Sequence, residues 1–144
     1  MKFNYKRKLK IIIISYLLLL TCATFSFAQD NVKIEEVIIA KGQSLSTTIV
    51  PIKDYKYFQI IMPSSWTTAN LTFQTSDTST GTFQDVYDEN NTEVVVQAAS
   101  SRNIILTTSG LYLISSKFLK IRSGTTGTPV NQTSQRTIKL ILKK

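Results

Sequence analysis

Short runs of alternating apolar and polar residues fill most of the chain from residue 29 onward. In the clearest run, residues 71–76 (LTFQTS), the apolar side chains of Leu71 and Phe73 alternate with polar ones. A period of two places successive side chains on opposite faces of an extended chain, which is typical of a half-buried β-strand. Similar runs predict strands at 32–40, 45–52, 55–62, 71–76, 82–87, 92–97, 102–107, 111–122 and 135–142.

Turn residues separate these runs at intervals of about ten residues, and no segment has the period of an amphipathic helix. This spacing predicts a single all-β domain, a sandwich or a barrel, of eight to nine short strands. Pro51 is expected at the edge or the end of its strand, because proline cannot donate a ladder hydrogen bond. Apolar residues lie on both faces of the 55–62 run, which predicts a central strand. The change of phase at Glu35-Glu36 predicts an irregularity in the first strand.

The segment from Met1 to Ala28 has the three parts of a secretory signal peptide. A basic start is followed by an apolar run from Leu9 to Leu20 and by small residues at Ser26 and Ala28. Cleavage after Ala28 would leave residues 29–144 as the folded domain, in the periplasm or outside the cell. The apolar run is shorter than the roughly 20 residues that span a bilayer. A membrane anchor formed by residues 9–28 is the alternative, and a lipoprotein acylated at Cys22 is a second one.

Removal of this segment changes the charge of the chain. The full sequence has 17 basic and nine acidic residues, a net charge of +8. Five of the basic residues lie between Met1 and Ala28, so that residues 29–144 carry 12 basic and nine acidic residues, a net charge of +3. That balance is ordinary for a soluble domain and does not favour a nucleic-acid partner.

Two absences from the sequence narrow the possible chemistry. The chain has no histidine, and its one cysteine, Cys22, lies in the signal segment. The domain therefore has no disulfide, no zinc site built from His or Cys, and no histidine base for a catalytic triad. No cofactor and no catalytic residue is predicted, and we expect a protein that is not an enzyme.

Four segments resemble sequences of a known group. They are MPSSWTTANLTFQTS (62–76), TFQDVYD (82–88), FLKIRSGT (118–125) and PVNQ (129–132). The chain from about residue 45 to 142 resembles a family of small proteins encoded in virion gene clusters of tailed phages and prophages. More distantly, it is similar to discoidin-like, galactose-binding-like jelly rolls. This resemblance implies a jelly-roll sandwich and says little about activity. The signal peptide departs from the pattern, since virion proteins normally assemble in the cytoplasm.

Three loops are predicted to gather at one end of the sandwich and to bind a ligand. They are the segment around Trp66, the turn at 77–81 with Asp77, and the loop at 123–133 with Asn131. The Trp66 ring is either a stacking platform for a sugar or a part of the core, since buried aromatic rings contribute strongly to packing.

Charged residues provide two further candidate sites. Lys120 and Arg122 share one face of a strand and, with Lys117 and Arg102, form either a basic patch for an anionic glycan or partner or a solvated outer face. Asp85, Asp88 and Glu89 are candidate calcium ligands, although acidic residues also cap turns and this spacing does not fit an EF-hand loop.

Together these patterns predict an exported, non-enzymatic binding module for a surface carbohydrate or a protein partner. The alternative is a structural component, related to phage virions or to a cell-surface particle, that docks through a sheet face or edge.

The signal-peptide hypothesis can be tested on protein recovered from the exported fraction. Intact-mass spectrometry should give a chain that begins at Gln29, because signal peptidase cleaves after small residues such as Ala28. A mass that retains Met1–Ala28 would contradict this hypothesis and favour the anchor.

Overall fold

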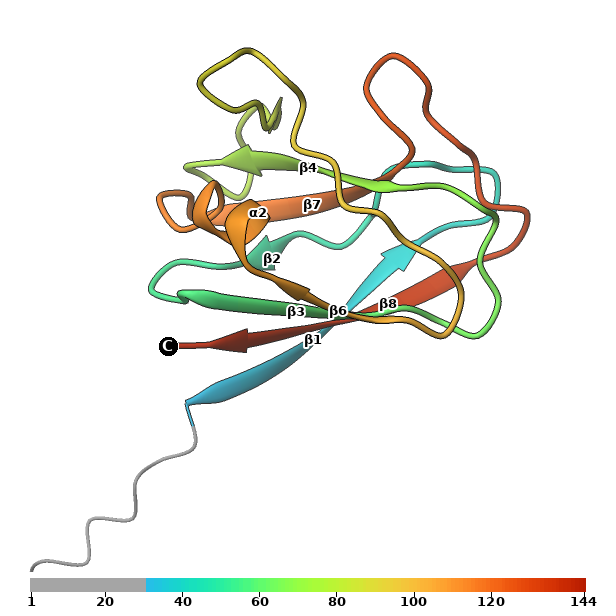
Figure 1. The fold of residues 1–144 in the computed structure, drawn as a ribbon, viewed down its shortest axis with the longest axis horizontal. Coiled ribbons are helices and arrows are strands. Elements are labelled where there is room, and N and C mark those ends of the chain that lie inside the picture. The colour runs from blue at the N-terminus through green and yellow to red at the C-terminus, as the bar shows by residue number, and fades with distance from the viewer. Residues whose placement is uncertain (1–30) are drawn as a thin grey trace, which may run out of the picture. The chain divides into compact units, whose positions relative to one another are not determined.

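The computed structural model describes residues 31–144, which contain eight β-strands in two antiparallel sheets of four (Figure 1). Sheet A has the order β1 (Val32–Ile39), β8 (Arg136–Lys143), β3 (Tyr57–Ile61), β6 (Asn103–Leu106). Sheet B has the order β2 (Val50–Pro51), β7 (Phe118–Ser123), β4 (Leu71–Ser76), β5 (Gln84–Asp85). Within the described residues, α2 (Thr108–Leu111) is a single helical turn. The all-β prediction is confirmed.

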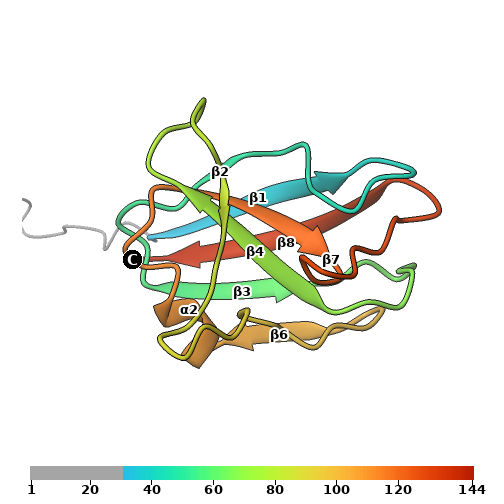
Figure 2. The ribbon, with the colours of Figure 1, turned by 90° about the horizontal axis from the view of Figure 1, so that it is seen from above.

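The strand pairs are nested along the chain. Strand β1 pairs with β8, β2 with β7, β3 with β6 and β4 with β5, and successive pairs alternate between sheet A and sheet B. The pairs β3–β8 and β4–β7 then join the nested pairs within each sheet. The two halves of the chain therefore run antiparallel beside each other. Figure 2 shows the result from above, with β1, β8, β3 and β6 side by side and β4 crossing them.

One hydrophobic core is shared by the two sheets. Alternate residues of β8 and β3 are fully buried, for example Leu140 and Ile60, and sheet B contributes fully buried residues such as Phe73 in β4 and Ile121 in β7. The intervening residues of β8 and β3 face outward. The period of two in the sequence thus corresponds to one buried and one outer face in each sheet.

Several strand predictions agree with the structure. The 71–76 strand is confirmed with its bounds, and the 55–62 run is a central strand of sheet A, as its composition predicts. Pro51 is the last residue of β2, which is an edge strand of sheet B. The predicted irregularity at Glu35-Glu36 is wrong, because β1 pairs with β8 residue for residue from Val32 to Ile39.

Other predicted strands are wrong in extent. The 45–52 run forms a strand only at Val50–Pro51, because the chain crosses between the sheets: Ser46 N–H donates to Ile121 of sheet B, and Thr47 N–H to Ile38 of sheet A. The 82–87 run is reduced to β5, and 92–97 makes only isolated bridges.

The first half of the predicted 111–122 strand folds differently. Residues 112–115 form turns after α2, with backbone hydrogen bonds from Leu113 to Gly110 and from Ser116 to Leu113. Leu113 is fully buried in the core. An apolar residue at this position therefore indicates a turn that packs against the core, and not a strand.

The sequence predictions on residues 1–28, including the signal peptide, the anchor at 9–28 and acylation at Cys22, lie outside the described residues. Within residues 31–144, no helix has the length and apolar character needed to cross a membrane.

The shared core predicts a sharp difference between two isoleucines. Ile60→Ala should lower the free energy of unfolding by about 2–5 kcal/mol, because it leaves a cavity between the sheets. Ile105→Ala, at an exposed position of the neighbouring strand, should change it by no more than about 0.5 kcal/mol. Denaturant unfolding of both variants measures the difference, and equal losses would contradict this assignment of buried and outer faces.

Candidate functional site

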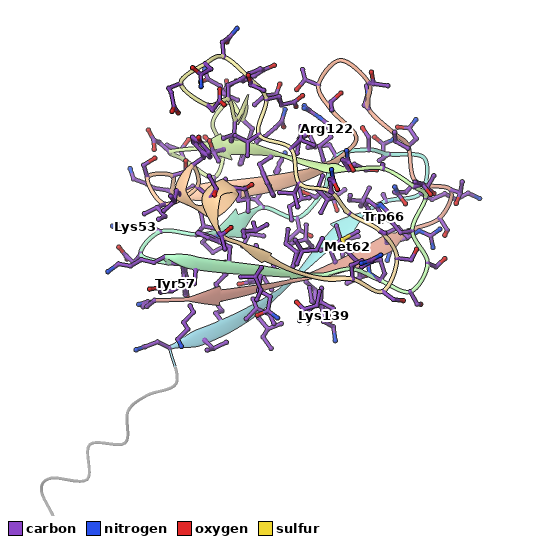
Figure 3. The ribbon with its side chains drawn as sticks, in the orientation of Figure 1. Lys53, Tyr57, Met62, Trp66, Arg122 and Lys139 are labelled. Atoms are coloured by element: carbon purple, nitrogen blue, oxygen red, sulfur yellow. The ribbon has the colours of Figure 1, made fainter. Side chains whose placement is uncertain are left out.

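Arg122 in β7 is the centre of a polar cluster on the outer face of sheet B. Its Nη1 lies 2.6 Å from Asp85 Oδ1, 3.5 Å from Glu93 Oε1 and 2.5 Å from Thr126 Oγ1. Gln74 in β4 donates from Nε2 to the same Asp85 oxygen at 2.9 Å. Arg122 is only 9% exposed. Figure 3 shows it between two loops above sheet B. The cluster thus ties both loops to the sheet.

Glu93 is the second carboxylate of the cluster and joins Arg122 to Thr126. Its carboxylate accepts hydrogen bonds from the backbone N–H of Thr126 at 2.9 Å and from the Thr126 hydroxyl at 2.7 Å. One carboxylate therefore binds the guanidinium of β7 and the loop that follows it. Glu93 and Thr126 were not singled out by the sequence, because no local pattern marks two partners that lie so far apart along the chain.

The environment of Asp85 favours its charged form. Partial burial by itself would raise the pKa of this carboxyl, but the hydrogen bonds from Gln74, Arg122 and Thr126 and the positive charge of Arg122 outweigh it. The net result is a pKa below its ordinary value of 3.8. This carboxylate is therefore a structural partner of Arg122 at neutral pH.

Lys120 and Arg122 do share the outer face of β7, while Ile121 between them is fully buried. The interpretation of this face as simply solvated is wrong at Arg122, because loops of the chain cover it. Arg122 is also not available to the predicted basic patch, because the carboxylates of Asp85 and Glu93 neutralise its charge. Lys120 Nζ lies 4.6 Å from the centre of the Phe83 ring, a cation–π contact.

Trp66 is part of the core. Its side chain belongs to the buried cluster, is 8% exposed, and donates from Nε1 to the Ala69 carbonyl at 3.0 Å. A sugar-stacking platform needs an exposed ring face, and this ring has none to offer. The packing interpretation of Trp66 therefore fits the structure, and the stacking interpretation does not.

The three predicted binding loops do not meet at one end. Trp66 precedes the start of β4, whereas the 77–81 turn follows its end, about 20 Å away along a six-residue strand. The 123–133 loop does lie beside the Trp66 segment, because the buried Gln132 amide accepts from Thr67 N–H and donates to Ser123. Asn131 is exposed next to it.

Asp77 lines a polar hollow of about 480 Å³ at the far end of β4. Its walls are mostly hydroxyl-bearing residues, and Asp77 is the only titratable side chain among the described residues that line it. Arg102 lies in a different hollow of about 500 Å³, together with Asn70, Gln97 and Asn103. Of the six predicted binding residues, the structure thus places Lys120 beside Arg122 on β7 and Asn131 near the Trp66 segment, and it leaves Asp77 and Arg102 in two separate hollows.

The three candidate calcium ligands have protein partners. Asp85 binds Arg122, and Asp88 Oδ1 accepts from the N–H groups of Asn90 at 2.9 Å and Thr92 at 2.8 Å, which is a turn cap. Glu89 accepts a long hydrogen bond of 3.4 Å from the Tyr112 hydroxyl. Within residues 31–144, no cluster of three acidic, histidine or cysteine side chains is arranged to hold a metal ion.

The outer face of sheet A is the surface that the sequence analysis missed. It exposes apolar side chains from several of its strands, among them Ile105 (70% exposed), Tyr57 (64%) and Ile34 (61%). The strand register places Ile105, Gln59, Ile141 and Ile34 in one row across the sheet. A shallow hollow of about 300 Å³ lies there between Val32, Tyr57, Ile105 and Lys143.

This apolar face lies on the opposite side of the molecule from the Arg122 cluster. Figure 3 shows Arg122 above sheet B and Lys139, an outward residue of β8, below sheet A. Contiguous exposed apolar side chains mark interaction surfaces more often than scattered ones do. The outer face of sheet A is therefore the strongest candidate site.

Comparisons of this chain with family models, with curated proteins and with solved structures found no match.

The Arg122 cluster predicts a pH-dependent contribution to stability. Asp85→Asn should lower the free energy of unfolding at neutral pH by about 1–3 kcal/mol, because it leaves Arg122 with one ion pair fewer in a partly buried position. The pKa of Asp85 is lowered in the folded state, so this contribution is present above pH 3.8 and is lost as the pH falls through the folded value.

Denaturant unfolding at a series of pH values measures this effect. The difference between the wild type and Asp85→Asn should shrink below pH 3.8. The exposed Asp77, which lies outside the cluster, provides the control: Asp77→Asn should stay within about 0.5 kcal/mol of the wild type. A loss at Asp85 that does not depend on pH would contradict the ion-pair explanation.

Proposed function

We propose that this chain is an exported, non-enzymatic β-sandwich module that binds a protein partner through the outer face of sheet A. The single observation that carries the proposal is the row of outward-facing side chains across that face, in which three isoleucines, Ile105 in β6, Ile141 in β8 and Ile34 in β1, share the row with Gln59. Export rests on the signal-peptide pattern between Met1 and Ala28.

The strand order supports a sandwich of the jelly-roll type. The nested pairs, from β1–β8 to β4–β5, alternate between two four-stranded sheets, which is what results when a long hairpin is rolled up. The residues that resemble discoidin-like proteins agree with this architecture. The fold itself does not select a function, because unrelated functions share such sandwiches. A binding function therefore depends on the exposed surface of this particular chain.

The chemistry of the face favours a protein surface over a sugar. Its exposed side chains combine aliphatic residues and Tyr57, a large aromatic anchor, with charged residues such as Glu36, Lys139 and Lys143, and such a mixture resembles a protein interface with an apolar centre and polar surroundings. The hollow beside Tyr57 could receive one apolar side chain of the partner. Carbohydrate recognition at the loops had its main support in Trp66, which is buried.

The charged residues at the margin of the face indicate which charges a partner should carry. Lys139 has Glu36 as its cross-strand neighbour, whereas Lys143 stands between Tyr57 and Val32. A complementary partner would have an apolar centre and a carboxylate opposite Lys143. The alternative function, an assembly component of a virion-like or cell-surface particle, would use the same face, and the partner would then be another subunit of that particle.

The proposed face can be tested with two tyrosines that are both exposed. A photo-crosslinking residue at position 57 should give a discrete adduct with a protein in the exporting cell, because Tyr57 lies on the apolar face. The same residue at position 87, which is exposed but lies outside sheet A, should not. With the identified partner, Tyr57→Ala should weaken binding by about tenfold or more, as expected of an aromatic anchor, and Tyr87→Ala should not.

Calorimetric titration of the purified pair measures both affinities. Equal effects of the two alanine substitutions would contradict the assignment of the face. A specific glycan-array signal that disappears in a folded Trp66→Ala variant would support the carbohydrate hypothesis instead.

A further inference from the structure

The edge strand β1 has an open segment at Val32–Glu36. At its other end, Ile38 N–H donates to Thr48 Oγ1 at 3.0 Å, and Ile38 C=O accepts from Thr47 N–H at 2.9 Å. The backbone groups of Ile38 therefore point away from β8. Residues of an antiparallel strand alternate in this direction, so those of Val32, Ile34 and Glu36 point the same way. Among residues 31–144, no group donates to them or accepts from them.

We propose that two copies of this chain pair their β1 strands antiparallel about a two-fold axis at Ile34. Ile34 then faces Ile34 of the second copy, and Val32 faces Glu36 of the second copy. These are the residues whose backbone groups are open, so each such pair forms the two hydrogen bonds of a regular ladder. The joined sheet has eight strands, and the interface uses the same patch of both copies.

The charges of β1 select this register. With the axis at Ile34, Lys33 stands opposite Glu35 of the second copy, and Glu35 opposite Lys33. The two side chains already share a face and form an ion pair within one chain. An axis at Lys33 would place Lys33 opposite its own copy, and an axis at Glu35 would place two glutamates together. Directly opposed like charges destabilise a sheet, so the Ile34 register is the self-complementary one of these three.

Two further features fit this interface. The segment Thr47–Thr48 occupies the edge at Ile38 and limits the pairing to the open residues. Ile34, which is strongly exposed in one copy, gains an apolar neighbour in the other, and the row through Ile141 and Gln59 to Ile105 continues into the second copy. Pairing also gives partners to the open backbone groups of Val32, Ile34 and Glu36, which are otherwise left at a bare sheet edge.

This inference does not depend on the proposed function. It concerns the edge of sheet A, whereas Tyr57 and Ile105 on the face take no part in the β1 pairing. Variants at Tyr57 should therefore leave the self-association unchanged, and the two proposals can fail separately.

Sedimentation of protein purified after expression of the full chain tests the pairing, over about 1–200 µM, the range in which a small interface associates. The wild type should pass from monomer to dimer with rising concentration. Lys33→Glu and Glu35→Lys should each raise the dissociation constant by about tenfold or more, because each places two like-charge pairs in the interface. Circular dichroism confirms that each variant is folded.

Two rescues distinguish this register from any other contact. The double variant Lys33→Glu/Glu35→Lys should dimerise as the wild type does, because the opposite charges face each other again. An equimolar mixture of the two single variants should form a heterodimer, although each alone is monomeric. Ile34→Pro, which removes an N–H that makes no bond to β8, should abolish the dimer in a folded chain. A wild type that stays monomeric at about 200 µM, or a dimer that ignores the charge reversals, would overturn the proposal.

Discussion

The ion cluster around Arg122 holds two segments of the chain against the outer face of sheet B. Its guanidinium is buried on the outer face of sheet B and needs the carboxylates of Asp85 and Glu93, since an unpaired charge in such a position is costly. Those carboxylates lie on the segment between β4 and β6, and Glu93 in turn holds the loop after β7 through Thr126. Sheet B is thereby covered around Arg122 by its own chain, whereas the outer face of sheet A and the open segment of β1 stay exposed.

Sheet A offers two surfaces that are compatible with each other. Its face carries the apolar row and Tyr57, and its edge carries the open backbone groups and the alternating charges of Lys33 and Glu35. Pairing at the edge would double the face and place two copies of the partner site on one continuous sheet. A module of this kind gains avidity for a repetitive surface without any new contact, which would suit both a cell-surface binder and a particle component.

The sequence predicts those parts of the structure in which local pattern and burial agree. The strand at 71–76 follows from its alternation and the central strand within 55–62 from its apolar residues on both faces, and each has a regular ladder partner. The 45–52 run fails because its backbone bonds are divided between the two sheets. The change of phase at Glu35-Glu36 does not mark an irregular strand. Because β1 is regular and Val37 and Ile39 are buried, it marks an apolar residue, Ile34, on the outer face. Arg122 is a candidate from the sequence, but its ion-pair partners Asp85 and Glu93 are distant along the chain, and no local pattern pairs them with it.

Hydrogen exchange at β1 tests the role of this edge most directly. The amides of Glu35 and Val37 point toward β8 and should be protected at every protein concentration, whereas those of Ile34 and Glu36 point to the open edge. If two copies meet there, protection of Ile34 and Glu36 should be low in dilute solution and rise as the protein is concentrated. If the exchange rates of the Ile34 and Glu36 amides do not change with protein concentration, the edge does not pair, and the role assigned to β1 is wrong.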